Sequence, residues 1–489
     1  MEEMTTDQDD PKSHRQSLMD QLEEGTSQFF FDTVSYSHDY PIEEKQSQKQ
    51  SHKSGQTFQQ ASIFHWPETL YEEMSAMAEV SFLIYFFGYL INCGRRNANA
   101  SDSLKQLYLD VHAGNETLEA QKYTPQRLLD IVQENLQHLQ ATPHFPDDPQ
   151  HTIDSLKVIL ERSGNGETVP PTTLVGYNDR NQDEELVYGV GLDHHSKRIT
   201  VVLRGTEINQ GIGVSCNDWR SNLRTTRKPM KIPKGIRKLV ENKIRRVKLH
   251  QGYQERVFYE RDGANTVSTR YTSANLLNLT GLTSSSPKDQ ERKYDEILKV
   301  VKRQSELYPT YKIYVTGHSL GAAMASIIAF LFASEPDLPK PITTINFASP
   351  RVGNHKFLRC CIVLEREKQL RFCRVINKHD TVSTFPFFLY CHAGFQVVLR
   401  NKHLHVSYPR INDAWWRWLA RSMRNSVTAR LTIDLLDQHM EYRGRIQKLR
   451  HLLEKINLNQ LYSDLKMTGF EVDYGETTEC RDESGVIIA

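Results

Sequence analysis

Hydrophobic residues are distributed unevenly along the chain, and the first long segment contains few of them. Up to about residue 60, the side chains are mostly Gln, Ser, Asp, Glu and Lys. Such a segment cannot bury enough apolar surface to offset the entropy lost on ordering. We therefore predict a disordered polar tail over residues 1–60, with a regulatory or targeting segment as the alternative.

A strongly apolar stretch follows this tail. Residues 66–96 predict a helix, and within it the run from Val80 to Ile91 is continuously apolar between Glu79 and Asn92. The run is too short for a bilayer, which needs about 20 apolar residues in a helix. A buried core helix is therefore the predicted role, and a membrane-dipping segment is the alternative.

Two stretches rich in proline and glycine, 141–150 and 163–172, then interrupt the pattern. They separate an N-terminal helical segment, residues 61–163, from a region of different character. In that region, 185–192 and 198–205 are rich in β-branched residues and are joined by a short polar turn. This arrangement predicts a β-hairpin.

From about residue 294 the pattern alternates between the periods of helix and strand. The predicted elements are a helix at 294–308, a strand at 312–316, a helix at 320–334, a strand at 342–348, a helix at 354–369 and a strand at 371–377. Such alternation is typical of an α/β domain with a mainly parallel sheet. We assign residues 164–450 to this domain, with a polar surface insertion at about 264–294, and 451–489 to a C-terminal tail.

The overall charge of the 489-residue chain is nearly balanced, with 61 Lys and Arg against 60 Asp and Glu. There is thus no global attraction to polyanions. Locally, residues 220–248 hold twelve Lys and Arg but one acid, Glu241, and 414–424 combine three Trp with three Arg. A solvated basic face and a packed helix are the simpler interpretations, and lipid contact is the alternative for both. Nucleic-acid binding is not expected, because no recognised binding motif accompanies the charge.

The seven cysteines show no CxxC pair with zinc spacing. They indicate reduced thiols in a cytosolic-type compartment. The N-terminus is acidic and lacks the apolar core of a signal peptide, so an intracellular, non-secreted protein is expected.

One short stretch suggests chemistry: YKIYVTGHSLGAAMASIIAFLFA, residues 311–333. It places the pattern GxSxG, centred on Ser319, between a predicted strand and a helix, the setting of a nucleophile elbow. Gly317 and Gly321 would let strand and helix approach closely, and the helix N-terminus would favour a developing oxyanion. A turn of small residues between core elements is the simpler alternative.

A serine hydroxyl needs a base, and in this layout an acid and then a histidine follow it in sequence. Asp380 comes just after the predicted strand at 371–377, at the active-site edge of a parallel sheet; a turn-capping role is its alternative. Weaker candidates for the acid are Glu365, Glu367, Asp413 and Asp434. Candidates for the base are His392, His403, His405 and His439, among which spacing does not decide.

Several motifs occur together in one order. They are VVLRGTE (201–207), NDWRSNL (217–223), LHQGY (249–253), VTGHSLGAA (315–323), INFASPRVGN (345–354), VINKHDTVSTFP (375–386), YCHAGF (390–395) and DQHMEYRGRI (437–446). Over roughly residues 170–446 the chain therefore resembles the class 3 (fungal-type, triacylglycerol) lipases. The resemblance implies an α/β-hydrolase fold in which Ser319 is the nucleophile, Asp380 the acid and His439 the base.

The resemblance also implies an oxyanion hole formed by Thr206 and Leu320. The aromatic residue that often precedes Arg-Gly in the family is Leu203 here, which should alter packing alone. The family's lid corresponds to residues 207–216, a stretch longer than in compact fungal members, so activation by a lipid surface does not follow.

The implied function is hydrolysis of lipid esters through an acyl-enzyme, with no metal or cofactor. The substrate would be an acylglycerol, a phospholipid or a galactolipid. Peripheral contact with an anionic membrane or a lipid droplet is the expected partner interaction. A soluble carboxylesterase and a non-catalytic lipase-like signalling or scaffold protein are the alternatives.

Overall fold

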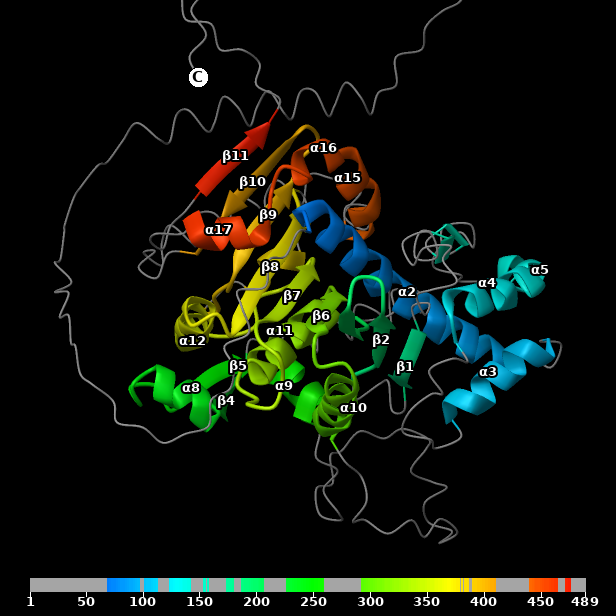
Figure 1. Ribbon diagram of the computed structural model, residues 1–489, viewed down its shortest axis with the longest axis horizontal. Helices are drawn as coiled ribbons and strands as arrows, with labels where there is room; N and C mark the ends of the chain where they lie inside the picture. Colours follow the sequence, from blue (N-terminus) through cyan, green and yellow to red (C-terminus); the bar gives the residue numbers. More distant parts are fainter. Residues whose placement is uncertain are drawn as a thin grey trace, which may run out of the picture. The chain divides into compact units, whose positions relative to one another are not determined.

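A computed structural model describes the part of the chain that carries the predicted α/β domain (Figure 1). The described residues are 68–96, 101–112, 123–141, 153–154, 156–157, 173–179, 186–205, 226–258, 292–378, 380, 382–386, 389–409, 439–464 and 471–475. They all belong to one compact unit, Trp66–Ala489. The expected tail at 1–60 and nearly all of the expected insertion at 264–294 lie outside them.

A sheet of nine strands forms the centre of the described region, in the order β1-β2-β3-β6-β7-β8-β9-β10-β11. The strands are β1 (Thr173–Asn178), β2 (Tyr188–Asp193), β3 (Arg198–Leu203), β6 (Lys312–His318), β7 (Ile342–Phe347), β8 (Leu370–Asn377), β9 (Phe395–Leu399), β10 (His403–Ser407) and β11 (Glu471–Gly475). The five strands from β3 to β9 run parallel. The outer strands pair antiparallel at both edges, so the mainly parallel sheet predicted from sequence is confirmed.

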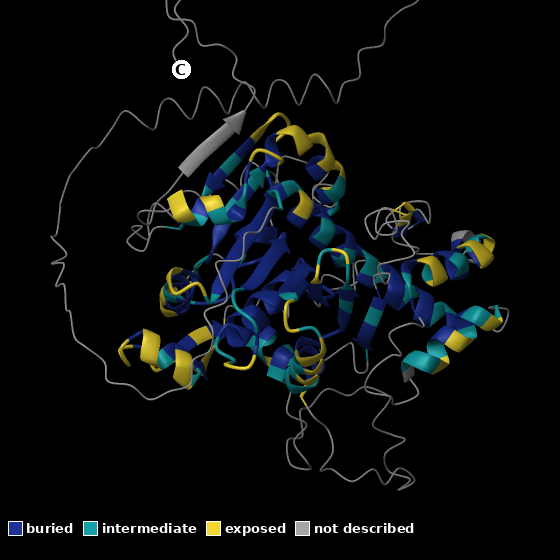
Figure 2. Cartoon of the chain, in the orientation of Figure 1, coloured by how far each residue is buried: buried dark blue, intermediate teal, exposed yellow. Residues whose placement is uncertain are grey.

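The alternating run after residue 294 folds as predicted. Helix α10 (Lys293–Leu307) precedes β6, α11 (Leu320–Phe332) connects β6 to β7, and α12 (His355–Arg366) connects β7 to β8. The central strands are buried on both faces (Figure 2), which explains their nearly continuous apolar sequences. The predicted hairpin is the antiparallel pair β2–β3.

Helix α2 (Leu70–Arg96) packs across the sheet against β3, β6 and β7 (Figure 1). By length and composition it is the one helix of the described region that could cross a membrane, but about 72% of that apolar window is buried inside the protein. Met74, Met77 and Phe82 lie in the main core. The prediction of a buried core helix is therefore confirmed.

The remaining elements surround this centre. They are α3 (Asp102–His112), α4 (Pro125–Glu134), α5 (Leu136–Ala141), β4 (Arg227–Lys231), α8 (Lys234–Leu239), β5 (Arg246–His250), α9 (Gln251–Phe258), the short 3-10 helix η3 (Val382–Thr384), α15 (Tyr442–Lys448), α16 (Arg450–Leu453) and α17 (Leu458–Asp464). Strands β4 and β5 form a separate antiparallel pair. The residues assigned from sequence to a C-terminal tail contribute α17 to the core and β11 to the sheet.

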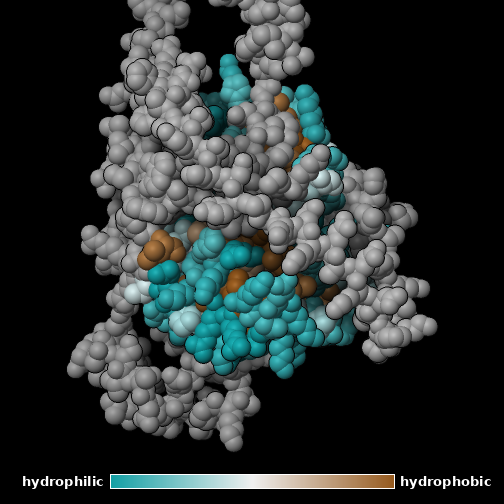
Figure 3. All heavy atoms as spheres, turned by 90° about the vertical axis from the view of Figure 1, so that its left-hand side faces the viewer, coloured by the Kyte–Doolittle hydropathy of each residue, from teal (hydrophilic) through white to brown (hydrophobic). Residues whose placement is uncertain are grey.

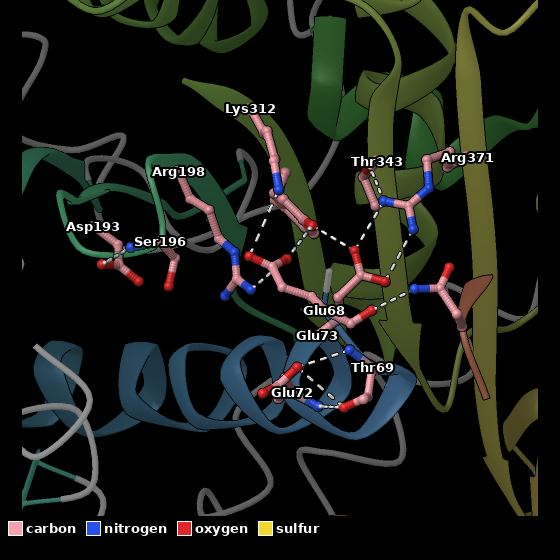
Figure 4. A network of polar contacts seen from close by, with 12 residues as sticks. Glu68, Thr69, Glu72, Glu73, Asp193, Ser196, Arg198, Lys312, Thr343 and Arg371 are labelled. Carbon is pink, nitrogen blue, oxygen red and sulfur yellow. Dashed lines mark hydrogen bonds and ion pairs between the residues drawn. The ribbon is translucent and has the colours of Figure 1, made fainter. Parts of the chain in front are cut away.

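A buried polar network fixes the first turns of α2 to the amino ends of the strands (Figure 4). Glu73 accepts two hydrogen bonds from Arg371, at 2.8 and 3.0 Å, and one from the Tyr314 hydroxyl at 2.5 Å. Glu68 pairs with Arg198 at 2.8 Å. Burial raises the Glu73 pKa, but Arg371 and the hydrogen bonds outweigh burial and hold the pKa below its ordinary value.

Candidate active site

Ser319 occupies the turn between β6 and α11, as the elbow pattern predicts. Its backbone has φ of 58° and ψ of −126°, a combination that costs a non-glycine residue about 1–3 kcal/mol. The surrounding chain holds this conformation, because the Ser319 N–H donates to the Phe347 carbonyl at 3.0 Å and the Ser319 carbonyl accepts from the Ala322 N–H at 3.0 Å. The strain is thus localised on the expected nucleophile.

The two elbow glycines are required by close backbone approach. A Cβ at Gly321 would collide with the Leu203 carbonyl oxygen, at the end of β3. A Cβ at Gly317 would lie 2.6 Å from the Gly321 carbonyl carbon. Any side chain at either position would push α11 away from the strand ends and move Ser319.

Asp380 and His439, far apart in sequence, meet in the buried interior. His439 Nδ1 lies 3.0 and 3.1 Å from the two carboxylate oxygens of Asp380. The same carboxylate accepts hydrogen bonds from the Tyr442 hydroxyl at 2.6 Å and from the Val382 N–H at 3.0 Å. Asp380, His439 and Ser319 are each no more than 6% exposed.

These contacts decide the ionisation of Asp380. Burial alone would raise its pKa, but His439 and the hydrogen bonds from His439 and Tyr442 outweigh burial, so the pKa lies below its ordinary value. Burial and the adjacent Asp380 raise the Tyr442 pKa well above its usual range. The centre therefore contains a carboxylate, not a neutral acid, beside the histidine.

The other candidates for acid and base that the structure describes lie outside the Asp380–His439 pair. His403 and His405 are on β10, and His392 hydrogen-bonds to the backbone of Ser383. Glu365 accepts from Tyr408 and Tyr462, at 2.6 Å each. Glu367 follows the end of α12, and Asp413 and Asp434 are outside the described residues, as are Thr206, the lid stretch 207–216 and the tryptophan-rich stretch 414–424.

His318, the variable residue of the elbow motif, connects the elbow to the histidine. Its Nε2 lies 2.8 Å from the His439 carbonyl oxygen. A carbonyl can only accept, so the His318 proton is on Nε2 and the Nδ1 lone pair faces the Tyr85 hydroxyl, 3.4 Å away. Burial and the neighbouring His439 lower the His318 pKa to about 3, so this ring stays neutral.

Helix α2 also contacts the elbow, through the side chain of Tyr85. Its hydroxyl accepts a hydrogen bond from the Gly205 N–H at 3.0 Å. Gly205 is so close to the elbow that a Cβ there would lie 2.7 Å from the His318 carbonyl oxygen and 3.3 Å from the Ser319 Cβ. The positions of Tyr442 and His318 fall within the sequence motifs, but their contacts, and the role of Tyr85, could not be predicted because each depends on distant segments.

The comparison with protein families agrees with this geometry. Residues 200–390 match the family described as lipase (class 3). Over these residues the chain is thus similar to the class 3 lipases. The mainly parallel sheet, with its strand, turn and helix around Ser319, is the α/β-hydrolase architecture that this similarity implies.

Named relatives match the chain over short stretches. The chain is 37% identical over 105 residues to phospholipase A1-Igamma3, chloroplastic, of Arabidopsis thaliana, covering 19% of each protein. It is 34% identical over 110 residues to a lipase of Rhizopus niveus, covering 22% of this chain and 27% of that one. Among solved structures, lipase II from Rhizopus niveus aligns with a TM-score of 0.31 and 23% identity, over 47% of this chain and 66% of that one.

The chain thus spans between a fifth and a third of the length of the curated relatives it matches. The activity, substrates and partners of the whole protein are therefore matters of proposal. Among the described residues, no group of three or more His, Cys, Asp and Glu is arranged to hold a metal ion.

Proposed function

We propose that the protein is a serine ester hydrolase that acts on lipid esters through Ser319, His439 and Asp380. The observation that carries the proposal is the buried pair of His439 Nδ1 and the Asp380 carboxylate at 3.0 Å, in the same interior as a strained elbow serine. A histidine held through Nδ1 directs Nε2 toward the role of base, as in serine hydrolases.

In the proposed reaction, His439 Nε2 takes the Ser319 hydroxyl proton while the serine oxygen forms a bond to the ester carbonyl carbon. The carbonyl π electrons move onto its oxygen. Collapse of this intermediate breaks the bond to the alcohol, which leaves with the proton held by His439. Water then loses a proton to His439 and attacks the acyl-enzyme carbonyl carbon. The bond to the Ser319 oxygen breaks, the fatty acid leaves, and His439 returns the proton to Ser319.

Asp380 supports each step without taking the proton. Its lowered pKa keeps it ionised at neutral pH, so it stabilises the imidazolium form of His439. Its burial strengthens this attraction, because the effective dielectric constant is lower than in water. Tyr442 and Val382 hold the carboxylate in place.

For the oxyanion we propose the Leu320 N–H, in the first turn of α11, together with Thr206. The N-terminus of α11 directs a partial positive charge toward a developing oxyanion beside Ser319. The Ser319 N–H is already bonded to Phe347, which supports Leu320 as the donor.

Lipid esters are proposed as the substrates because the matching relatives include plant phospholipases A1 and Rhizopus lipases. The substrate would then be a phospholipid, a galactolipid or an acylglycerol. Such substrates are held in membranes and droplets, so peripheral contact with a lipid surface belongs to this proposal.

The first test is labelling of the purified protein with a fluorophosphonate probe. We expect labelling of the wild type, none of Ser319→Ala and strongly reduced labelling of His439→Ala. Ser326→Ala is the matched control, since Ser326 lies on α11 and its hydroxyl is bonded to the Ala322 carbonyl; this variant should label normally.

A panel of phospholipid, galactolipid and triacylglycerol substrates then separates the lipid classes. Turnover of short soluble esters alone would favour a soluble carboxylesterase. Absence of labelling in folded wild-type protein, with and without lipid micelles, would refute the enzyme and favour a non-catalytic lipase-like protein.

A further inference from the structure

An exposed basic surface lies on β4, β5, α8 and the first turns of α12. We call it the basic face and define it by ten exposed side chains: Lys228, Lys231, Lys234, Lys238, Lys243, Arg245, Arg246, Lys248, Lys356 and Arg359. These elements pack on one another, since α12 contacts both β5 and α8. The charges therefore belong to one folded surface, not to a loose segment.

Few acids neutralise this face. In the part of the chain that the structure describes, Lys243 pairs with Glu241 at 2.5 Å and Lys228 with Glu255 at 3.8 Å. The other eight cations form no ion pair with a described residue. Exposed pairs of this kind contribute little energy, so most of the charge is available to an outside partner.

The two-stranded sheet arranges like charges side by side. Lys231 lies directly opposite Arg246, and both are exposed, whereas the next pair, Met230 and Val247, faces the core. Like charges directly opposite one another destabilise a sheet. Burial of Met230 and Val247 explains why the sheet folds, but the fold gains nothing from the paired cations, which fit a negatively charged partner.

Apolar side chains are exposed next to these charges. Leu239, at the end of α8, is 38% exposed, and Leu389 is 67% exposed. Leu389 has φ of 65°, which is unusual for a bulky residue, and its carbonyl accepts from Arg227 of β4 at 3.4 Å. On this side of the molecule the described surface is mostly hydrophilic, with hydrophobic areas among the polar ones (Figure 3).

The elements of the basic face contact the loops at the edge of the sheet where Ser319 and Asp380 lie. The chain after β8 carries Asp380 and continues to Tyr390, whose hydroxyl donates to the Thr226 carbonyl, next to β4, at 3.1 Å. The chain after β7 is joined to β5 by the bridge between Leu249 and Gly353. The part of the basic face around Lys248 and the start of α12 therefore lies beside the carboxyl ends of the strands, and α8 extends the face toward Ser334, beyond the end of α11.

We propose that the basic face docks the protein on an anionic lipid bilayer, an inference that rests on the proposed function as a lipid ester hydrolase. Its Lys and Arg side chains bind headgroup phosphates and carboxylates, and Leu239 and Leu389 enter the headgroup region. The exposed leucines and the adjacent site favour a bilayer over nucleic acid, whose binding needs no apolar contact.

The test is flotation of the Ser319→Ala protein with vesicles, because this variant leaves the lipid intact. We expect binding to phosphatidylcholine vesicles that contain phosphatidylserine, weak binding to phosphatidylcholine alone, and loss of binding at high salt. The triple variant Lys231→Glu, Arg246→Glu and Lys248→Glu should bind at least about 100-fold more weakly, since each base near an anionic surface contributes about fivefold.

The matched control reverses three exposed charges elsewhere, Arg400→Glu, Lys402→Glu and Lys455→Glu, and should bind as tightly as the parent. Equal weakening in both triple variants, or tighter binding of the parent protein to a duplex oligonucleotide than to the vesicles, would overturn the proposal. Because Ser319→Ala lacks the nucleophile, vesicle binding is read independently of catalysis. With Ser319 present, the Lys231 triple variant should still hydrolyse soluble short-chain esters at the wild-type rate.

Discussion

At the scale of single residues, the hydrogen bond from His318 Nε2 to the His439 carbonyl oxygen links the elbow to the segment of the proposed base. The bond is 2.8 Å long and is formed by the residue immediately before Ser319. It therefore sets the distance between the backbone of the proposed nucleophile and that of the proposed base. His318 touches neither proton in the reaction, so its role is to position.

We predict that His318→Leu lowers kcat for a short-chain ester by roughly 10- to 100-fold, because small displacements of catalytic groups have effects of that size. KM should change little, since His318 is buried away from solvent. His318→Gln keeps an N–H donor of similar reach and should recover most of kcat. Wild-type kcat in a folded His318→Leu protein would exclude the positioning role.

At the scale of elements, the ion pair of Glu73 and Arg371 joins α2 to β8. Both side chains are almost fully buried. We predict that Glu73→Gln lowers the free energy of unfolding by about 3–5 kcal/mol, because it leaves Arg371 buried without its counter-ion. Urea denaturation measures the change, and the exposed neighbour variant Glu72→Gln should change stability by less than about 1 kcal/mol.

The double variant Glu73→Met with Arg371→Leu distinguishes two explanations of that loss. If the penalty comes from an unpaired buried charge, replacing both partners by apolar groups should restore most of the stability. If the double variant is as unstable as Glu73→Gln, then the pair itself stabilises the docking of α2.

A second contact between elements should make stability depend on pH. Burial raises the pKa of Glu365 on α12 from 4.5 to about 7, although the hydroxyls of Tyr408 and Tyr462 partly oppose the shift. The folded state thus binds this proton more tightly than the unfolded state. The contribution of Glu365 to the free energy of unfolding is therefore fully present below about pH 4.5. It is lost as the pH rises toward about 7.

We predict that this group lowers the free energy of unfolding by about 3 kcal/mol between those limits, since each unit of pKa corresponds to about 1.4 kcal/mol. Glu365→Gln should remove that part of the pH dependence in urea titrations at several pH values. The exposed Glu367→Gln is the control, and an unchanged slope in Glu365→Gln would contradict the prediction.

The helices and strands that could be predicted were those in which the hydrophobic pattern of the element itself indicates its structure. From α10 to β8, the strands are buried on both faces, α11 is apolar throughout, and α10 and α12 repeat apolar residues at the period of a helix, so predicted and observed ends differ by at most three residues. Strands β9 and β10 were not predicted, because they are short and lie among charged and polar residues. The pair β4–β5 was also missed, since its exposed positions are mostly Lys and Arg.

At the scale of the whole molecule, the residues of the candidate site could be predicted from the family motifs. They could not be predicted from the hydrophobic pattern or from the spacing of residues. Spacing alone left four histidines open, and the family resemblance selected His439. Its contact with Asp380 bridges 59 residues. The contact of Tyr85 with Gly205 bridges 120 residues, between a helix and a loop that share no motif. Such contacts depend on how α2 lies on the sheet, which no local pattern specifies.

Helix α2 also joins the two ends of the described chain. The Leu70 N–H donates to the Ile456 carbonyl at 2.7 Å, and the Tyr71 hydroxyl donates to Gln447 of α15 at 2.6 Å. Glu79 of α2 pairs with Arg443 at 3.2 Å, four residues after His439. Through these contacts, α2 supports the segment that carries the proposed base as well as the elbow.

We therefore predict that a chain beginning at Trp66, the start of the compact unit, remains soluble and reacts with the fluorophosphonate probe. A chain beginning at residue 97 lacks α2, so it exposes the apolar face of β3, β6 and β7 and frees α15 from its ion pair. It should be insoluble, or should lack near-ultraviolet circular dichroism and labelling. If this shorter chain folds and labels normally, α2 is an accessory to the hydrolase domain and the positioning roles inferred for Tyr85 and Glu79 are wrong.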